Sequence, residues 1–149
     1  MKREYPERPL VGVGAVIVED GRVVLVRRGA EPMAGEWSIP GGLVELGETL
    51  RAGAEREALE ETGLRVEASE VLEVLDRIVP DADGKPRYHY VLIDFLCRRI
   101  TGELRAGGDA AEARWVRESE LAGLGVAEPA GRVICKAFSR DTMRSHEGP

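Results

Sequence analysis

The sequence has few cysteine, histidine and aromatic residues. Its 149 residues include two cysteines, two histidines and only 5% aromatic residues. Cys97 and Cys135 lie far apart, there is no CxxC pair, and no histidine stands near either cysteine at the spacing of a zinc site. The sequence therefore gives no indication of a zinc module, and both thiols are predicted to be free and buried.

Long hydrophobic runs are also absent. No apolar segment approaches the roughly 18 residues that a transmembrane helix requires. The opening segment, MKREYPERPL, has no apolar stretch between its charged residues and a cleavage site, as a secretory leader would have. We therefore predict a cytoplasmic location and no association with membranes.

Positive charge is scarcer than negative charge. The net charge is −6, whereas binding to a nucleic-acid duplex needs a basic surface that displaces counterions. This argues against a nucleic-acid partner but permits a polyphosphate substrate if a metal ion bridges the two. Residues 42–64 hold six glutamates and two arginines, a net charge of −4, so two-thirds of the excess negative charge lies in this short segment.

Length and composition predict one folded domain. A chain of this size can bury roughly 68–70% of its unfolded surface, which is enough for one sizeable core. Hydrophobic residues make up 43% and charged residues 32% of the chain, values typical of globular proteins. There is no internal repeat and no linker. The expected domain spans residues 1–149, with a core at about 8–140 and polar tails.

The first half of the chain predicts a hairpin followed by a helix. Residues 10–18 and 22–28 read as strands around the turn Glu19-Asp20-Gly21. Thr49 is a suitable N-cap for a helix over about 50–62, and Gly63 is a suitable stop. Between these elements, Pro40-Gly41-Gly42 is expected to turn the backbone sharply.

The second half predicts further strands and covering helices. Residues 71–79 and 88–100 read as long strands joined by the turn-rich segment 80–87. Shorter strands are expected at 101–104 and 113–116, and helices at 118–124 and 129–139. The predicted fold class is therefore α/β (α+β), a mixed β-sheet flanked by helices.

The helix over 50–62 concentrates acidic side chains. Glu57, Glu60 and Glu61 stand at i, i+3 and i+4, so their carboxylates emerge on nearly one helical face. A solvated surface with ordinary pairs such as Arg56 with Glu60 is one interpretation. The other is a cation site, because Mg²⁺ takes oxygen ligands and bridges carboxylates to phosphates.

A longer pattern favours the cation site. From Gly42 the segment GLVELGETLRAGAEREALEETGL fits G-x5-E-x7-R-E-U-x-E-E-x-G-U, with U aliphatic, at every specified position. A chance match is on the order of 10⁻⁷ per starting position. This pattern is the Nudix box, so the chain resembles the MutT-related Nudix hydrolases. The segment GEWSIPGG, which leads into the start of the box, is also similar to the corresponding segment of that family. The resemblance implies an α/β/α sandwich that hydrolyses nucleoside diphosphates linked to another moiety X, with Mg²⁺ as cofactor and Mn²⁺ as a substitute.

The resemblance also implies roles for single residues. The family's metal ligands correspond to three glutamates and a backbone carbonyl: Glu57, Glu60, Glu61 and Gly41. Its catalytic residues correspond to Glu57 as the base, with Arg56 and Glu60. Glu48 is implied to hold Arg56 or a metal-bound water, and Gly42 to let a loop approach the helix.

Predictions outside the box concern the substrate. Arg27 and Arg28 are candidate ligands of phosphate or ribose, because a guanidinium binds such oxygens in pairs. A later loop offers two acids for metal binding or base catalysis, of which Glu112 is preferred to Asp109. Trp37 is expected either to pack against the sheet or to stack on a nucleobase.

Several functional alternatives stay open. The run YHYVLIDFLCR and the chain length are similar to bacterial ADP-ribose pyrophosphatases, which favours ADP-ribose-like substrates. A MutT-type hydrolase of oxidised nucleoside triphosphates is the alternative enzyme, and a non-catalytic nucleotide sensor on the same fold is an alternative of another class. The strands around 71–100 could form a homodimer interface or merely a covered sheet.

Overall fold

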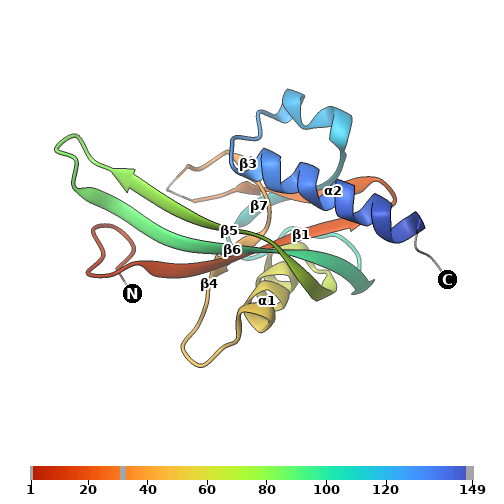
Figure 1. Ribbon diagram of the computed structural model, residues 1–149, viewed down its shortest axis with the longest axis horizontal. Coiled ribbons are helices and arrows are strands. Elements are labelled where there is room, and N and C mark those ends of the chain that lie inside the picture. The colour runs from red at the N-terminus through yellow and green to blue at the C-terminus, as the bar shows by residue number, and fades with distance from the viewer. Residues whose placement is uncertain (1, 31–32, 147–149) are drawn as a thin grey trace.

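The computed structural model describes residues 2–30 and 33–146 and arranges them around a mixed β-sheet between two helices (Figure 1). In chain order the elements are β1 (Leu10–Glu19), β2 (Arg22–Arg28), β3 (Trp37–Ser38), β4 (Gly41–Leu43), α1 (Leu50–Thr62), β5 (Arg65–Pro80), β6 (Pro86–Thr101), β7 (Ala110–Arg117), the 3₁₀ helices η1 (Glu118–Glu120) and η2 (Ala122–Leu124), and α2 (Ala130–His146). The predicted fold class is confirmed.

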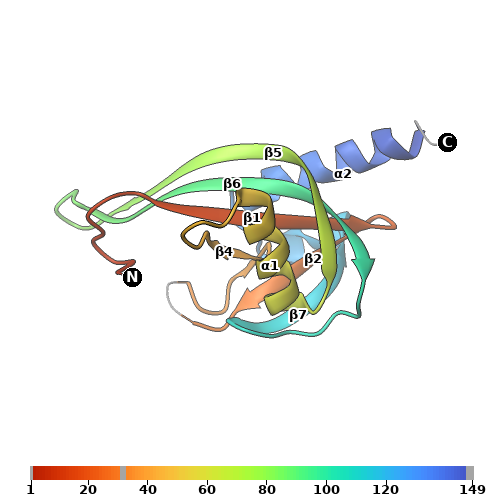
Figure 2. The ribbon, with the colours of Figure 1, turned by 90° about the horizontal axis from the view of Figure 1, so that it is seen from below.

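Strand β1 is the centre of the sheet. The strand order is β3-β2-β1-β6-β5, with β4 also paired to β1 and β7 to β2. Strand β1 runs parallel to β6, whereas its pairing with β2 and β4 is antiparallel. Figure 2 shows the long hairpin of β5 and β6 extending past the end of the sheet. The topology therefore brings β4, which leads into α1, beside the glycine-containing part of β1.

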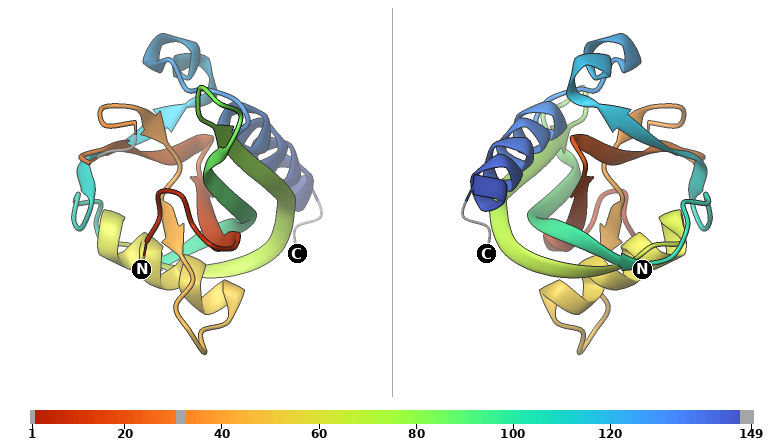
Figure 3. Two further views of the ribbon diagram at one scale, coloured as in Figure 1. Left: turned by 90° about the vertical axis from the view of Figure 1, so that its left-hand side faces the viewer. Right: turned by 90° about the vertical axis from the view of Figure 1, so that its right-hand side faces the viewer.

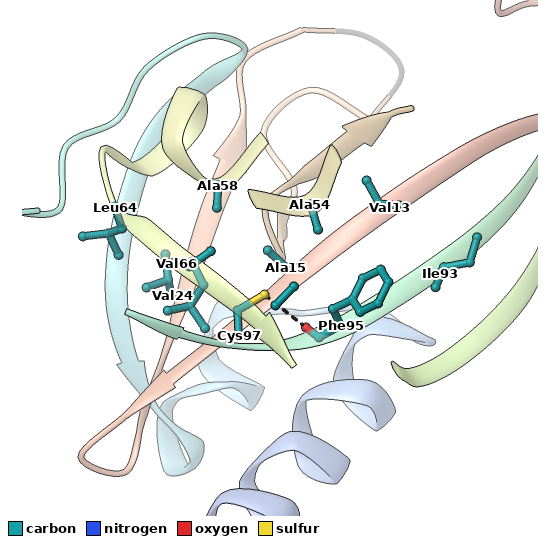
Figure 4. Packing of buried hydrophobic residues seen from close by; sticks show 12 residues of the cluster. Val13, Ala15, Val24, Ala54, Ala58, Leu64, Val66, Ile93, Phe95 and Cys97 are labelled. Atoms are coloured by element: carbon teal, nitrogen blue, oxygen red, sulfur yellow. Dashed lines mark hydrogen bonds between the residues drawn. The ribbon is translucent and has the colours of Figure 1, made fainter. Parts of the chain in front are cut away.

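One core cluster lies between α1 and the sheet. Ala54 and Ala58 of α1 have no exposed surface, and they face Ala15, Val24 and Phe95 from the strands (Figure 4). Two small alanines allow the helix to lie close to the sheet. Its start and stop are as predicted, because the Thr49 side chain accepts a hydrogen bond from the Ala52 N–H and Gly63 adopts a left-handed conformation with φ 74°. The ends of the helix are thus fixed by local chemistry.

A second core cluster lies under α2 on the opposite face of the sheet (Figure 3). Val133, Ile134 and Ala137 of this helix are completely buried against residues such as Val16 and Leu25. The two clusters account for the apolar strands of the middle of the sheet, which are buried on both faces. This layered arrangement leaves the helix α1 free to present its other side to a cleft.

The predicted elements differ from the structure in three places. Strand β5 begins at Arg65 and not near residue 71. Its first part was missed because register shifts against β6 between Ala68 and Glu73 interrupt the two-residue alternation that marks a strand. The short strand predicted at 101–104 is wrong, since β6 ends at Thr101 and Gly102 has a φ of +100°. The helix predicted at 118–124 is two separate 3₁₀ turns.

The other expectations for the elements and the cysteines have clear outcomes. The hairpin of 10–18 with 22–28, the strand at 113–116 and the last helix are confirmed, although the helix continues to His146. Both cysteines are free, but only Cys97 is buried and Cys135 is exposed, so the prediction for Cys135 is wrong. Over the described ranges, no helix is both long and apolar enough to cross a bilayer.

Candidate active site

The glutamates of α1 meet the end of β4 at a small polar cavity. Glu57 and Glu61, one helical turn apart, line a cavity of about 110 Å³ together with Gly41 and Gly42 of β4. Arg28 and Asp109 also line it. The cavity therefore combines acidic groups from the helix and from the loop before β7 with a guanidinium from the end of β2.

The glycines of β4 make this approach possible. A Cβ atom at Gly42 would lie 2.5 Å from the carboxylate carbon of Glu57, and one at Gly41 would lie 2.3 Å from the carbonyl oxygen of Val13. Any side chain at either position would push the strand away from the helix or from β1. The structure thus brings Gly42 and α1 as close together as the sequence pattern implies.

Glu61 is the most deeply buried acid of the cavity. It is 7% exposed, and one of its carboxylate oxygens accepts a hydrogen bond of 2.9 Å from the Gly41 N–H. Burial raises the pKa of Glu61 to about 7, and the negative charges of Glu57 and Asp109 act in the same direction. A buried carboxyl group with an elevated pKa is a site where a cation would be strongly favoured.

Glu57 lies beside Glu61 and, unlike Glu61, accepts a hydrogen bond from the Arg56 guanidinium. Burial is the largest effect and raises the pKa of Glu57, while the hydrogen bond from Arg56 opposes it. The Glu57 side chain is 15% exposed, and Arg56 Nη1 donates to its Oε1 at 2.8 Å. The carboxylate is therefore held in one orientation while part of it still faces the cavity.

Arg56 organises this end of the site. Its Nε and Nη2 donate to the two carboxylate oxygens of Glu48 at 2.7 and 3.0 Å, and Nη2 also donates to the Leu43 carbonyl at 3.0 Å. The Glu48 contact raises the pKa of Arg56 and, in return, lowers the pKa of Glu48. The planar fork therefore ties the loop before α1, strand β4 and Glu57 into one unit.

Glu60 takes a different position from its two neighbours. It does not line the cavity, its side chain is 53% exposed, and Arg56 Nη1 donates to it at 3.3 Å. Within residues 2–30 and 33–146, no group of three acidic, histidine or cysteine side chains is close enough to hold a metal ion. The helix thus brings together two of the three predicted glutamate ligands, and the third lies against Arg56.

The oxygen donors of the cavity fit a hard divalent cation. Glu57, Glu61 and Asp109 line the cavity with carboxylates, although the three do not converge on one point among the described residues, and the described wall contains neither sulfur nor imidazole. Glu57 and Glu61 both have raised pKa values and the charge of Glu57 repels that of Glu61, so a cation would relieve that repulsion. The donor chemistry therefore fits Mg²⁺ or Mn²⁺ better than zinc.

A family model decides what kind of domain carries this site. The NUDIX domain model matches residues 8–137. The chain belongs to the NUDIX domain family. The acidic cavity lies on the Nudix box of this domain, since Gly42, Glu57 and Glu61, which line it, are all members of the box.

Known NUDIX proteins resemble the chain in sequence and fold. It is 41% identical over 107 residues to an ADP-ribose pyrophosphatase of Methanocaldococcus jannaschii, covering 72% of this chain and 61% of that protein. It is 33% identical over 108 residues to a MutT-like protein of Streptomyces ambofaciens, covering 72% and 63%. The chain thus spans about three-fifths of these relatives. A NUDIX hydrolase structure from Nitrosomonas europaea aligns with a TM-score of 0.69 at 29% identity, over 96% of this chain and 75% of that one.

The residues predicted outside the Nudix box separate into two groups. Arg28 lines the acidic cavity, whereas Arg27 pairs with Glu112 at 3.7 Å on the neighbouring strands β2 and β7. Glu112 does not line the cavity, but Asp109 does, because Gly107 donates to the Glu61 carbonyl and holds this loop against the end of α1. The structure therefore favours Asp109 where the sequence favoured Glu112.

A larger pocket of the NUDIX domain adjoins the acidic cavity. It has a volume of about 220 Å³ and shares Arg28, Ser38, Ile39, Gly41 and Gly42 with the cavity. Its other walls include aromatic and apolar residues from β3, β5 and β6: Trp37, Leu75, Tyr90 and Leu92. Trp37 lines the pocket and packs on the second core cluster, so its packing on the sheet is confirmed, whereas stacking on a nucleobase stays a prediction.

One polar residue of this pocket was missed at the sequence level. Asp94 of β6 lines the pocket and is 6% exposed. Burial, followed by the nearby charge of Glu73, raises its pKa to about 6. The available signal was a lone acidic residue within the otherwise apolar run YVLIDFLC, since such a residue inside a buried strand needs an explanation.

Proposed function

We propose that this protein is a Mg²⁺-dependent pyrophosphohydrolase that cleaves nucleoside diphosphates linked to another group. The observation that carries the proposal is a pair of carboxylates, the partly buried Glu57 and the buried Glu61, at the junction of a small acidic cavity with a larger, mostly apolar pocket. A diphosphate would occupy the first space and a nucleoside the second. The membership in the NUDIX family supports the same assignment.

The proposed metal ligands are the oxygen donors of the acidic cavity. Glu57, Glu61 and the Gly41 carbonyl are taken from the Nudix box pattern, and the placement of Asp109 adds a fourth group. Glu60 stays a proposed ligand from the pattern, and its contact with Arg56 would have to break for it to serve. When bound, Mg²⁺ supplies Lewis-acid stabilisation of the charge that develops on the diphosphate.

The residues of the chain supply orientation and proton transfer. Glu57 is proposed to accept the proton of the attacking water, because its carboxylate is both fixed by Arg56 and open to the cavity. Glu48 keeps the Arg56 guanidinium in place from the other side. Arg28 is proposed to contact a phosphate oxygen of the substrate. Arg27, paired with Glu112, has no proposed role in the site.

ADP-ribose-like compounds are the proposed substrates. The similarity to the pyrophosphatase of Methanocaldococcus jannaschii supports this choice. A MutT-type nucleoside triphosphate hydrolase is the second candidate, supported by the similarity to the Streptomyces protein. A panel of ADP-ribose, sugar nucleotides and oxidised deoxynucleoside triphosphates, assayed with Mg²⁺ in ¹⁸O-labelled water, separates the two.

The panel has a decisive outcome for each candidate. Release of AMP and ribose phosphate from ADP-ribose, with the label showing which phosphorus received water, supports the first. Rapid release of pyrophosphate from a deoxynucleoside triphosphate without turnover of ADP-ribose supports the second. Turnover of no phosphoric anhydride would contradict both and leave the sensor.

Substitution Glu57→Gln tests the proposed base. It removes one charge at nearly constant shape, so kcat should fall by about 10²–10⁴-fold while nucleotide binding largely survives. Glu67→Gln is the matched control, because Glu67 is an exposed residue of β5. Unchanged kcat in Glu57→Gln would remove this residue from the mechanism.

A further inference from the structure

The carboxylate of Asp94 lies in the larger pocket without a partner among the residues that the structure describes. The residue is only 6% exposed, and the described residues give it neither a hydrogen bond nor an ion pair. Because no fully enclosed side-chain oxygen in the described residues lacks a partner, the carboxylate oxygens of Asp94 must remain open to the pocket. Its neighbour Glu73 on β5 is itself bound to Arg132 at 2.8 Å and adds only repulsion. An unpaired carboxylate is costly to bury, so a ligand that supplies hydrogen-bond donors would offset that cost.

The backbone fixes where this carboxylate points. A Cβ atom at Gly14 would lie 2.2 Å from Asp94 Oδ1 and 2.7 Å from Ile39 Cδ1. The carboxylate therefore lies directly above the β1 backbone, in space that any other residue at position 14 would occupy. Glycine at this position keeps the carboxylate at the pocket wall beside Ile39.

The position of Asp94 relative to the acidic cavity defines the part of a substrate that it can reach. Gly14 stands opposite Gly41 of β4 on one side and opposite Asp94 of β6 on the other. Two strand spacings amount to about 10 Å between the backbones at Gly41 and Asp94, and the carboxylate leans back over Gly14. Gly41 and Ile39 line both spaces, and Ile39 lies beside the Asp94 carboxylate, so Asp94 stands in the part of the larger pocket that adjoins the acidic cavity.

We propose that Asp94 binds the vicinal hydroxyl groups of the ribose attached to the diphosphate. This inference rests on the proposed function, since it places the diphosphate in the acidic cavity. An ionised carboxylate has two oxygens that only accept hydrogen bonds, and a 2′,3′-diol offers two adjacent donors. A second phosphate would be repelled, and adenine offers a single amine flanked by acceptors. The base would then lie farther out, beside Tyr90 and Leu75.

Binding of nucleotides that differ only in their hydroxyl groups tests the proposal. ADP, 2′-deoxy-ADP and 3′-deoxy-ADP are titrated by calorimetry, with Mg²⁺, into the wild-type protein. Each lost hydrogen bond to a charged acceptor should weaken binding about ten-fold or more. In Asp94→Asn the three affinities should converge to within about three-fold, because an amide offers one neutral acceptor in place of the carboxylate.

Two further variants make the outcome specific. Asp76→Asn is the matched control, because Asp76 is an exposed residue of β5 that lines neither pocket, and it should keep the wild-type ratios. Gly14→Ala keeps the charge but moves the carboxylate, and it should also reduce the ratios. If Asp94→Asn does not fold, Gly14→Ala together with the wild-type ratios still decides the question.

The results that overturn the proposal are distinct from failure of the proposed function. Equal binding of the three nucleotides by the wild-type protein, or wild-type ratios in Asp94→Asn, would overturn it. A changed preference between ADP and GDP with unchanged hydroxyl ratios would assign Asp94 to the base and also overturn it. Turnover of no phosphoric anhydride together with the expected hydroxyl ratios would contradict the proposed function alone.

Discussion

At the scale of single residues, Arg56 has the largest set of contacts at the site. One guanidinium group donates to Glu48, Glu57, Glu60 and the Leu43 carbonyl. A lysine in its place would provide a point charge but not the planar fork that reaches these groups together. The orientation of Glu57 therefore depends on the shape of the Arg56 side chain as well as its charge.

We expect Arg56→Lys to lower kcat about 10–100-fold with little change in KM. The charge beside Glu57 is kept, but the carboxylate loses its fixed orientation, which is the kind of loss seen when groups that orient active-site residues are removed. Steady-state kinetics with ADP-ribose measures the effect. Arg98→Lys serves as control, because Arg98 is an exposed residue whose side chain is 66% accessible. Equal kcat values in all three proteins would contradict the orienting role.

The titration of Asp94 gives a prediction about stability. Its pKa is about 6 in the folded protein, above the usual 3.8, mainly because of burial. The folded state then binds the proton more tightly than the unfolded state, so the contribution of Asp94 to stability is largest below pH 4 and is lost as the pH rises through about 6. The full effect amounts to about 3 kcal/mol at most.

Urea denaturation of the wild-type protein and Asp94→Asn measures this contribution. We expect the variant to gain stability relative to the wild-type protein as the pH rises from 4 to 7.5, because asparagine does not ionise. The comparison cancels the titration of Glu57 and Glu61, which is common to both proteins. A difference in unfolding free energy that stays constant with pH would contradict the burial of an ionising Asp94.

At the scale of elements, the contact of β4 with α1 depends on the absence of a side chain. Gly42→Ala would place a methyl group 2.5 Å from the Glu57 carboxylate carbon, so the helix or the strand must move. We expect a loss of about 1–3 kcal/mol in unfolding free energy together with a large loss of kcat. Gly123→Ala is the matched control, because no heavy atom lies within 4 Å of its added Cβ and its φ is not positive. Similar effects in both variants would contradict the close approach as the cause.

The sequence predicted the ends of helix α1 but not the start of strand β5. Helix α1 was predicted to within its caps, because Thr49 and Gly63 mark its ends by local chemistry. The start of β5 was missed, since bulges opposite β6 remove the alternation between Ala68 and Glu73. Local hydrogen bonds can be read from neighbouring residues, whereas a register shift depends on the partner strand.

At the scale of the whole molecule, cation binding should stabilise the fold. Glu57 and Glu61 come from α1, Asp109 from the loop before β7 and Gly41 from β4, so the proposed cation joins three segments that are distant in sequence. A ligand that binds only the folded state adds about 2.7 kcal/mol at a concentration 100 times its Kd. The melting temperature should therefore rise with Mg²⁺ concentration.

Differential scanning calorimetry over a series of Mg²⁺ concentrations measures this rise. We expect the shift to disappear in the double variant Glu57→Gln, Glu61→Gln, while the exposed control Glu67→Gln keeps it. Sodium at equal ionic strength corrects for general screening of charge. The same shift in the double variant would show that the cation binds elsewhere, and the proposed ligands would then be wrong.

The sequence alone determined the NUDIX family, the α1 boundaries and the acidic composition of the site, because these depend on residues within one short segment. The tertiary structure decided which groups face one another. It brought Asp109, and not Glu112, to the cavity, and it placed Asp94 above Gly14. The spacing of residues along one helix fixes their relative directions, but the pairing of strands that are 80 residues apart fixes which side chains share a pocket.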